Sequence, residues 1–329
     1  MVANPSSGSR LYDERERMTS AATMYYMQGE TMEAVAGRLG TSRSSVSRLL
    51  KEARAQGIVQ ITVTDQAQQS AEGSALREIF GVEAHVVPVR GTSSPMTRLN
   101  SVAKAAAQMI SGWMSDGAVL GLAWGNTLTA VVPHLPPRPL SGAVVVQLNG
   151  TATASSTGLT DANHLLSRAA EAFSAEIQPF PTPAFFDYAE TKQLLWRERA
   201  VRRIVELQHQ ADIAVFGVGV PGGEISSHLY VGDFLTQQDV RELESERVVG
   251  DICTVFYRED GSWEDIAINA RASGPSARDL AAVPRRVCVV AGRPKVRGTL
   301  GALRSGAITD LVVDDLTARA LLERVRHGH

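Results

Sequence analysis

The sequence predicts an α/β protein in two parts: an N-terminal winged helix-turn-helix domain over residues 1–65 and a mostly parallel α/β domain over residues 66–329. Its length of 329 residues suits about two domains. The composition changes near residue 65, from short helices rich in Arg and Ser to apolar strands that alternate with amphipathic helices. Strands that are apolar throughout are typical of a parallel sheet that helices cover on both faces.

The overall composition excludes several classes of protein. Hydrophobic residues make up 44% and charged residues 21%, which excludes disorder on a large scale. The net charge of -2 excludes a wholly basic nucleic-acid binder but allows a basic patch on one domain. Two cysteines, Cys253 and Cys288, exclude a disulfide scaffold and suit buried thiols in the cytoplasm. The chain has neither an apolar run of ~18 residues nor a signal peptide, so we expect no membrane partner.

The first domain is predicted from residue spacing. Residues Leu11–Met27 read as a leading helix, and a helix-turn-helix follows it. Such a motif needs a small residue in its first helix, a glycine at the turn and apolar residues on the buried face of its second helix. Ala36, Gly40, Val46 and Leu49 fill these roles. Thr41 or Ser42 is expected to cap the second helix, and Gly57 to end it.

The second of these helices leaves a polar face outward. Between Thr41 and Gln56 there are four cations and one anion, a net charge of +3. Arg and Ser side chains suit base edges and phosphates, so we predict that this face binds operator DNA. The alternative is an ordinary helical hairpin with a solvated face. The segment Ile58–Val63 alternates like a strand and is expected to form a wing. The predicted DNA-binding residues are Ser42, Arg43, Ser44, Ser45, Ser47, Arg48 and Lys51.

The second domain follows a polar stretch, Thr64–Ser74, which reads as a linker or as the solvated start of a helix ending near Phe80. Beyond it, apolar runs predict strands and amphipathic runs predict helices. The predicted strands are His85–Val89, Ala118–Ala123, Ala143–Leu148, Asp212–Gly219, Cys253–Tyr257, Arg286–Gly292 and Asp310–Asp314. The predicted helices are Pro95–Met114, Ala162–Ala175, Thr191–Gln208, Gln237–Glu246, Lys295–Ser305 and Leu316–Arg326.

Polar residues follow several of these strands, where open α/β sheets bind ligands. Backbone N–H groups and a hydroxyl at Gly125, Asn126 and Thr127 suit an anion, although a plain strand–helix turn fits as well. Gln147, Asn149 and Gly150 end a buried strand and suit sugar hydroxyls. Asp251 reads equally as a ligand group or a turn carboxylate. Lys295 precedes a helix and suits a phosphate, whereas Asp314 or Asp315 is expected to cap the last helix.

The helix-turn-helix, the Met24–Gly29 run and these loops together resemble the SorC family of sugar-responsive transcription regulators, over nearly the whole chain. The resemblance implies dimers or tetramers and an effector domain related to sugar-phosphate isomerases and deaminases, which binds a sugar or sugar phosphate without turnover. It also implies that Gly125–Thr127 and Lys295 hold the phosphate and that Asp251 takes sugar hydroxyls.

Two positions depart from the family pattern. Some relatives have Lys or Arg where this chain has Asn149, and asparagine can neither form an imine nor hold a second phosphate. This favours a hydroxyl-rich ligand such as a polyol or ketose monophosphate. The family commonly has Gly-Gly before its lysine, whereas this chain has Arg293 and Pro294 before Lys295.

The sequence therefore predicts a regulator whose operator binding is controlled by a phosphorylated sugar or polyol, acting as a homo-oligomer and not as an enzyme. An unphosphorylated sugar or polyol is the first alternative. A sugar-phosphate isomerase or deaminase, with Asp251 or His164 as its base, and a purely structural oligomerisation domain are the others. No cofactor and no metal are expected, because the seven histidines are scattered.

Overall fold

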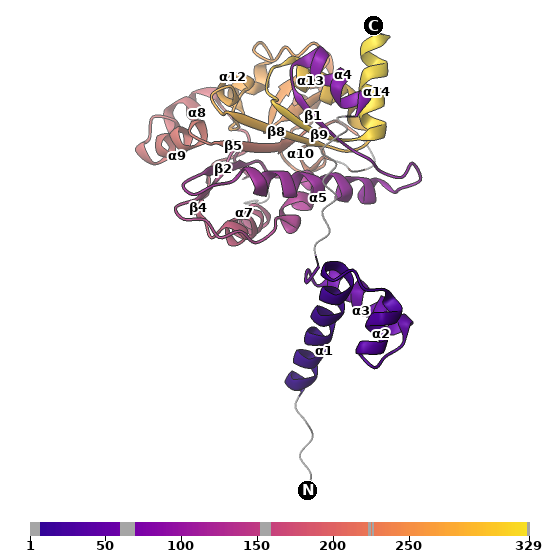
Figure 1. Cartoon of the computed structure of the whole chain (residues 1–329). Helices are drawn as coiled ribbons and strands as arrows, with labels where there is room; N and C mark the ends of the chain where they lie inside the picture. The colour runs from indigo at the N-terminus through magenta and orange to yellow at the C-terminus, as the bar shows by residue number, and fades with distance from the viewer. Residues whose placement is uncertain (1–6, 60–69, 152–158, 223–224, 226, 328–329) are drawn as a thin grey trace. The chain divides into compact units, whose positions relative to one another are not determined.

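The computed structural model describes residues 7–59, 70–151, 159–222, 225 and 227–327 (Figure 1). The chain divides into two compact units, Met1–Gln68 and Gln69–His329, close to the change in composition near residue 65. Each unit has its own hydrophobic core. None of the described helices is both long and apolar enough to cross a membrane.

The first unit is helical. Helix α1 (Ser7–Ala22) continues into a π-helical turn, η1 (Thr23–Met27), and helices α2 (Met32–Arg38) and α3 (Arg43–Ala55) follow. Ala36 and Val46 lie in the core, as predicted. Leu49, the third predicted core position, is partly buried and packs against this core, and its neighbour Leu50 is buried in it. The leading helix, first helix and second helix thus lie where the sequence predicts them.

The turn between α2 and α3 depends on Gly40, which has a φ of 58° that a side chain would disfavour. Ser42, not Thr41, caps α3, and its Oγ accepts a hydrogen bond from the Ser45 N–H at 3.2 Å. Gly57, with a φ of 71°, follows the last turn. Of the predicted wing, Ile58 and Val59 are not in a strand, and residues 60–63 lie outside the described residues.

The second unit is built on a seven-stranded sheet in the order β1-β9-β8-β5-β2-β3-β4, and every neighbouring pair is parallel. The apolar runs predict six of the strands, and only the short edge strand β4 lacks such a run. The strands are β1 (Glu83–Val87), β2 (Val119–Leu122), β3 (Val144–Gln147), β4 (Glu176–Gln178), β5 (Ile213–Gly217), β8 (Arg285–Val290) and β9 (Asp310–Asp314).

Helices cover both faces of this sheet (Figure 1). Successive strand residues pack on opposite faces, so that Val215 lies in one apolar cluster and Phe216 in the other. One face carries α4 (Ala71–Phe80), α12 (Ala277–Leu280), α13 (Val296–Arg304) and α14 (Asp315–Arg326). The other face carries α5 (Pro95–Trp113), α6 (Asn126–Val131), η2 (Val132–His134) and α7 (Leu159–Phe173).

The start of helix α4 shows what the described end of the polar stretch Thr64–Ser74 forms. Ser70 caps the helix by accepting a hydrogen bond from the Gly73 N–H at 3.0 Å, and the helix begins at Ala71. Residues 70–74 are therefore the start of the helix that ends at Phe80, and residues 64–69 lie outside the described part of the chain.

Two predicted elements are wrong. The run Cys253–Tyr257 is not a strand of the main sheet: β7 (Val255–Tyr257) pairs antiparallel with β6 (Gly250–Ile252) in a separate hairpin. The predicted helix Thr191–Gln208 is two helices, α8 (Ala189–Leu195) and α9 (Arg199–His209), because the chain turns at Trp196. The remaining elements are α10 (His228–Val231), α11 (Gln237–Ser245), η3 (Ala267–Arg271) and η4 (Arg293–Lys295).

Candidate ligand site

The sheet reverses its winding between β2 and β5. From β2 the chain adds β3 and β4 on one side, whereas β8, β9 and β1 lie beyond β5 on the other. Loops leave such a point in opposite directions and open a crevice outside the carboxyl ends of the strands. A cavity of about 70 Å³ lies there, lined by the loops that follow β2, β3, β5 and β8 and by the β6–β7 hairpin.

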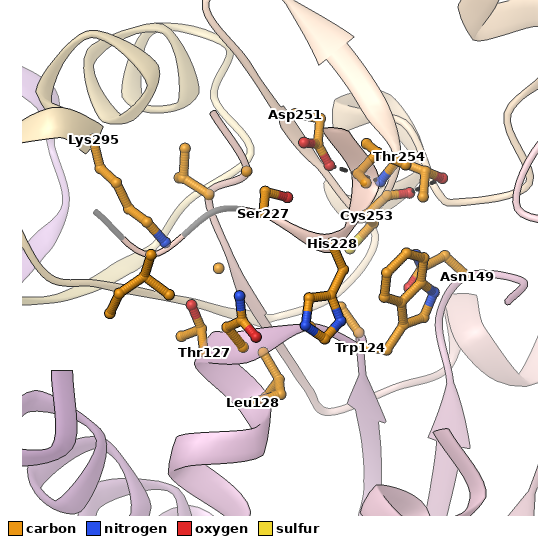
Figure 2. Close-up of a pocket in the computed structure, with 18 of the residues that line it drawn as sticks. Trp124, Thr127, Leu128, Asn149, Ser227, His228, Asp251, Cys253, Thr254 and Lys295 are labelled. Carbon is orange, nitrogen blue, oxygen red and sulfur yellow. Dashed lines mark hydrogen bonds between the residues drawn. The ribbon is translucent and has the colours of Figure 1, made fainter. Parts of the chain in front are cut away.

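Six of the eight residues predicted to bind the effector line this first cavity (Figure 2). They come from four separate stretches of the chain, and the fold brings them together. Helix α6 begins directly after Gly125, so the loop predicted at residues 125–127 is a helix start. The six lining residues are Gly125, Asn126, Thr127, Asn149, Asp251 and Lys295.

Gln147 and Gly150 do not line the cavity, so the structure does not support a direct contact from either of them. The Gln147 side-chain amide donates to the Asn149 carbonyl at 2.7 Å and accepts from the Phe180 N–H at 3.1 Å. The Gly150 carbonyl accepts from the Trp124 indole N–H at 2.9 Å. Both residues therefore hold the loop that carries Asn149, because their polar groups bond to other parts of the chain.

Asp251 combines the two roles that the sequence left open. Its Oδ2 accepts from the Thr254 N–H at 3.2 Å, which is a turn interaction within the β6–β7 hairpin. Its Oδ1 is buried without a hydrogen-bond partner in the described structure. A Cβ at Gly219 would lie only 2.0 Å from this oxygen, so the carboxylate fits only against a glycine. Burial raises the pKa of the Asp251 carboxyl to about 7, although the Thr254 N–H and the Lys295 ammonium oppose this.

Asn149 supplies a second unpaired acceptor. It is 2% exposed, and its Oδ1 has no hydrogen-bond partner among the described residues. A buried acceptor without a donor costs roughly 1–3 kcal/mol. Two such acceptors, Asn149 Oδ1 and Asp251 Oδ1, line one cavity. A ligand hydroxyl could donate to each of them and remove that cost.

Lys295 brings a cation to the same cavity. No carboxylate oxygen of the described residues lies within 4.0 Å of its ammonium group. Burial lowers the pKa of the Lys295 ammonium, and the Cys288 thiol and the Asp251 carboxyl act in the opposite direction. A partly buried ammonium without a close counter-ion is costly, and an anionic ligand group would compensate it.

Several residues that line the cavity were not predicted. Trp124 stacks on Phe234 with ring centroids 5.0 Å apart and forms an apolar wall beside Gly125. Cys253 is buried, as expected, but it also lines the cavity, where burial raises the pKa of its thiol well above the usual range. Only Trp124 had a signal in the sequence, its place next to the Gly125 loop. The others are Ser227, His228 and Thr254.

The predicted DNA-binding face lies on α3 and its N-terminus. Ser42 bonds to the hydroxyls of Ser44 at 2.8 Å and Ser45 at 2.9 Å, so these serines also build the helix cap. Arg43 forms an exposed ion pair with Glu33 of α2 at 3.0 Å. The exposed members of the predicted set are Ser42, Arg43, Ser44, Ser47, Arg48 and Lys51, and Ser45 is partly buried.

Two smaller predictions have clear outcomes. Asp314 caps α14 by accepting from the Thr317 N–H at 3.1 Å, as favoured. His164 is exposed on α7 and does not line the cavity, so it is not a candidate base there. Among the described residues, no group of three or more His, Cys, Asp or Glu side chains could hold a metal ion.

Comparison with known proteins agrees with this architecture. Residues 65–323 match the family described as "Putative sugar-binding domain". The deoxyribonucleoside regulator of Bacillus subtilis (strain 168) is 32% identical over 94% of this chain and 98% of its own length. The sorbitol operon regulator of Klebsiella pneumoniae is 26% identical over 94% of this chain and 99% of its own length. Both are named as regulators and not as enzymes, as the sequence predicts for this chain.

Solved structures are similar as well. The crystal structure of the full-length sorbitol operon regulator SorC from Klebsiella pneumoniae is 26% identical, with a TM-score of 0.76, over 94% of this chain and 99% of its own. A domain of "a possible sugar-binding transcriptional regulator" from Arthrobacter aurescens TC1 is 42% identical, with a TM-score of 0.73, over 79% of this chain and 100% of its own. The match over most of the sequence and the shared parallel α/β fold lead to one conclusion: the chain belongs to the SorC family of sugar-binding transcription regulators.

Proposed function

We propose that this protein is a DNA-binding transcription regulator whose affinity for its operator is controlled by a phosphorylated sugar or polyol bound in the first cavity. The observation that carries the proposal is the set of uncompensated polar groups there. Asn149 Oδ1 and Asp251 Oδ1 are buried acceptors without donors, and Lys295 has no close carboxylate among the described residues. A hydroxyl-rich anion supplies what both kinds of group lack.

The phosphate is assigned to the side of the cavity that holds Thr127 and Lys295. The Thr127 hydroxyl and the Lys295 ammonium come from loops after different strands, β2 and β8. Charge-assisted hydrogen bonds of this kind contribute about 1.5–3 kcal/mol each. The hydroxyls are assigned to Asn149 and Asp251. One relative is named as a sorbitol operon regulator, which supports a polyol among the ligands to be tested.

The DNA contact is assigned to α3. The exposed side chains of its outer face are serines and cations, and such side chains donate hydrogen bonds to phosphates and base edges. A ligand can change operator affinity only if it binds two conformational or assembly states of the protein unequally. The regulatory step is therefore a shift between two states, which the ligand drives by its difference in affinity.

The first prediction concerns this face. Removing both Arg43 and Arg48 by substitution with alanine is expected to weaken operator binding by on the order of 1–3 kcal/mol for each arginine that reads a base. The Glu33 pair must break before Arg43 reaches DNA, so Arg48 is expected to have the larger effect. Fluorescence anisotropy with labelled operator measures the affinity of the two single variants and of the double variant. The control is Arg77→Ala, an exposed arginine of the other unit. Operator affinity equal to wild type in the double variant would show that another face binds DNA.

The second prediction concerns assembly. A single small module makes few contacts with DNA, so specific binding is expected from a homo-oligomer that places two such modules on related half-sites. Light scattering at micromolar concentration is expected to give the mass of a dimer or tetramer of the 35.3 kDa chain. A monomeric mass both with and without operator would contradict this assembly.

A ligand panel tests the proposal as a whole. Sugars, polyols and their phosphates are added to the full chain, and thermal unfolding is followed. A ligand at 100 times its dissociation constant stabilises the folded state by about 2.7 kcal/mol. The rise in unfolding temperature that the ligand causes should be smaller in an Asn149→Leu variant, which removes one unpaired acceptor. If no sugar, polyol or phosphate raises the unfolding temperature, the purely structural interpretation of this domain gains support. Product formation from any ligand would support the enzyme alternative.

A further inference from the structure

A second, larger cavity of about 560 Å³ adjoins the first along the same edge of the sheet. Its volume is within the roughly 300–1,000 Å³ that is typical of small-molecule sites. The two cavities share three lining residues: Ile225, and Ala291 and Lys295 after β8. The second extends past them to residues that follow β9 and to the first turn of α5. Its lining includes Ser93, Pro95, Arg98, Gly292, Arg293 and Leu316.

Among the residues that the structure describes, the charged ones that line this second cavity are all cationic. They are Arg98, Arg293 and Lys295, and no acidic side chain of the described residues is among its lining. Arg98 is 7% exposed, and its Nη1 donates to Asp314 Oδ1 at 2.8 Å. This pair compensates one of the three cations. Arg293 and Lys295 have no carboxylate oxygen within 4.0 Å in the part of the chain that the structure describes.

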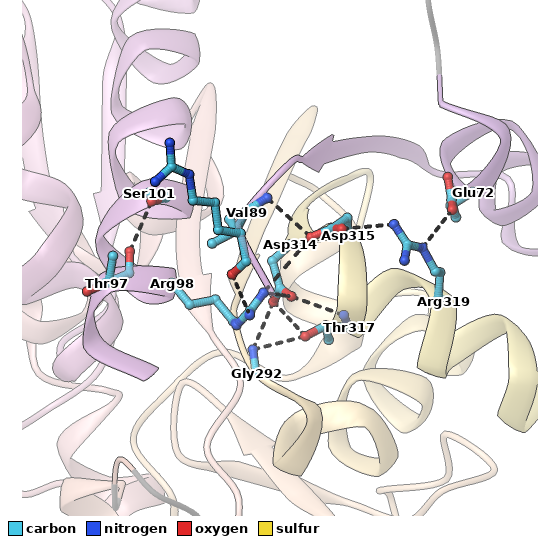
Figure 3. A network of polar contacts seen from close by, with 11 residues as sticks. Glu72, Val89, Thr97, Arg98, Ser101, Gly292, Asp314, Asp315, Thr317 and Arg319 are labelled. Atoms are coloured by element: carbon cyan, nitrogen blue, oxygen red, sulfur yellow. Dashed lines mark hydrogen bonds and ion pairs between the residues drawn. The ribbon is translucent and has the colours of Figure 1, made fainter. Parts of the chain in front are cut away.

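The carboxylate of Asp314 has no capacity left for the other cations (Figure 3). Its Oδ1 also accepts from the Thr317 N–H at 3.1 Å. Its Oδ2 accepts from the Gly292 N–H at 2.9 Å and from the Thr317 hydroxyl at 2.5 Å. Asp314 is 0% exposed and lies behind Arg98 in this network. The charged groups of the described residues that face the cavity are therefore positive.

Helix α5 adds to this positive potential. The helix has 19 residues, and its first turn, with Pro95 and Arg98, forms part of the wall. The N-terminus of a helix carries roughly half a positive charge. Two unpaired cations, the exposed Arg293 and the partly buried Lys295, and a helix start on one wall favour an anion over a neutral ligand, because an anion compensates their positive charge.

We propose that the second cavity is an anion subsite that binds a phosphate group through Arg293 and Lys295, beside the paired guanidinium of Arg98. The phosphate has two chemical sources: a free phosphate ion, or the phosphate of a ligand that reaches from the first cavity past Lys295 and places it beside Arg293 instead of Thr127. Only the second source rests on the function proposed above. In either case Lys295 serves both cavities, and Arg293 distinguishes the second from the first, because only the second is lined by Arg293.

Calorimetry of the full chain with inorganic phosphate tests the subsite itself. Arg293→Ala is expected to weaken phosphate binding at least ~10-fold, which is the loss of about one charge-assisted hydrogen bond. Arg297→Ala is the matched control: it removes an equal charge nearby, from a residue that pairs with Glu259 at 2.9 Å and lines neither cavity. The Arg297→Ala control is expected to bind inorganic phosphate like the wild type. Thr127→Val changes only the first cavity, so it tests the competing position of the anion beside Thr127.

The same titrations with sorbitol and sorbitol 6-phosphate distinguish the two sources. If the ligand carries the phosphate, Arg293→Ala weakens sorbitol 6-phosphate by the same factor as inorganic phosphate and leaves sorbitol unchanged. If the anion is a free ion, only inorganic phosphate loses affinity. Three results overturn the proposal: no binding of phosphate in either form at millimolar concentration, equal loss in Arg293→Ala and Arg297→Ala, or loss in Thr127→Val alone. The last would place the anion in the first cavity and leave the proposed function intact.

Discussion

Replacing Asp251 by asparagine is expected to make the unliganded protein more stable, and the gain should increase with pH. Burial raises the pKa of this carboxyl to about 7 in the folded state, whereas an unfolded aspartate titrates near 3.9. Between about pH 4 and pH 7 the folded state keeps a proton that the unfolded state has released, so the wild type loses stability as pH rises through this window. Each pKa unit by which the folded and unfolded states differ changes the free energy of unfolding by about 1.4 kcal/mol. Asparagine has no such penalty.

Urea unfolding at two pH values measures this effect. The free energy of unfolding of the variant should exceed that of the wild type by about 1.5 kcal/mol at pH 5 and by about 4 kcal/mol at pH 8. Tryptophan fluorescence reports on the second unit alone, because the four tryptophans, Trp113, Trp124, Trp196 and Trp263, all lie in it. If the difference in free energy of unfolding between variant and wild type is the same at both pH values, the assignment of a buried carboxyl with a raised pKa is wrong.

The same substitution at Asp314 is a matched control with the opposite sign. Asp314, the last residue of β9, is also buried, but Arg98, Gly292 and Thr317 satisfy both of its oxygens. Asp314→Asn breaks a buried ion pair, which typically costs about 3–5 kcal/mol. Two buried aspartates of one domain should thus respond in opposite directions. The difference identifies Asp251 as the one that is kept for a ligand at a cost in stability.

Replacing Lys295 by methionine is expected to weaken a phosphorylated sugar or polyol at least ~10-fold while operator affinity without ligand stays unchanged. The variant loses a charge-assisted hydrogen bond of about 1.5–3 kcal/mol but keeps most of the apolar volume. DNA binding is assigned to α3 in the other unit, so it has no direct contact to lose. Lys104→Met, an exposed lysine on α5, controls for the loss of one charge.

Calorimetry with the free and phosphorylated forms of one ligand measures this effect. The wild type should prefer the phosphorylated form, and Lys295→Met should remove most of that preference. Tighter binding of the free form, with no change in Lys295→Met, would refute the phosphate assignment and support a regulator of an unphosphorylated sugar or polyol.

The parallel sheet and most of the candidate site could be predicted because their signals are local. A continuous apolar run such as Val144–Gln147 predicts a buried strand, and the polar residue after it marks the edge where ligands bind. Gly125, Asn149 and Lys295 each follow a strand in this way, so knowing the sheet to be parallel was enough to place them together.

The parts that were missed depend on contacts between distant segments. The Cys253–Thr254 turn has two residues with positive φ, 50° and 71°, and neither is a glycine or asparagine that would mark a hairpin turn. Gln147 was predicted to meet the ligand, but the backbone of Phe180, which is remote in sequence, takes up its amide. Arg98 reads as part of an amphipathic helix, and only the fold pairs it with Asp314 after β9.

The most direct test of ligand-controlled DNA binding is the affinity of the full chain for DNA selected from a random pool, measured by anisotropy with and without the best phosphorylated ligand of the panel. Coupling between two sites is typically worth 1–3 kcal/mol, so saturating ligand should change the affinity about 5–150-fold. Lys295→Met should need at least ~10-fold more ligand to produce the same change. A ligand that binds the first cavity by calorimetry but leaves DNA affinity unchanged at saturation would contradict the account.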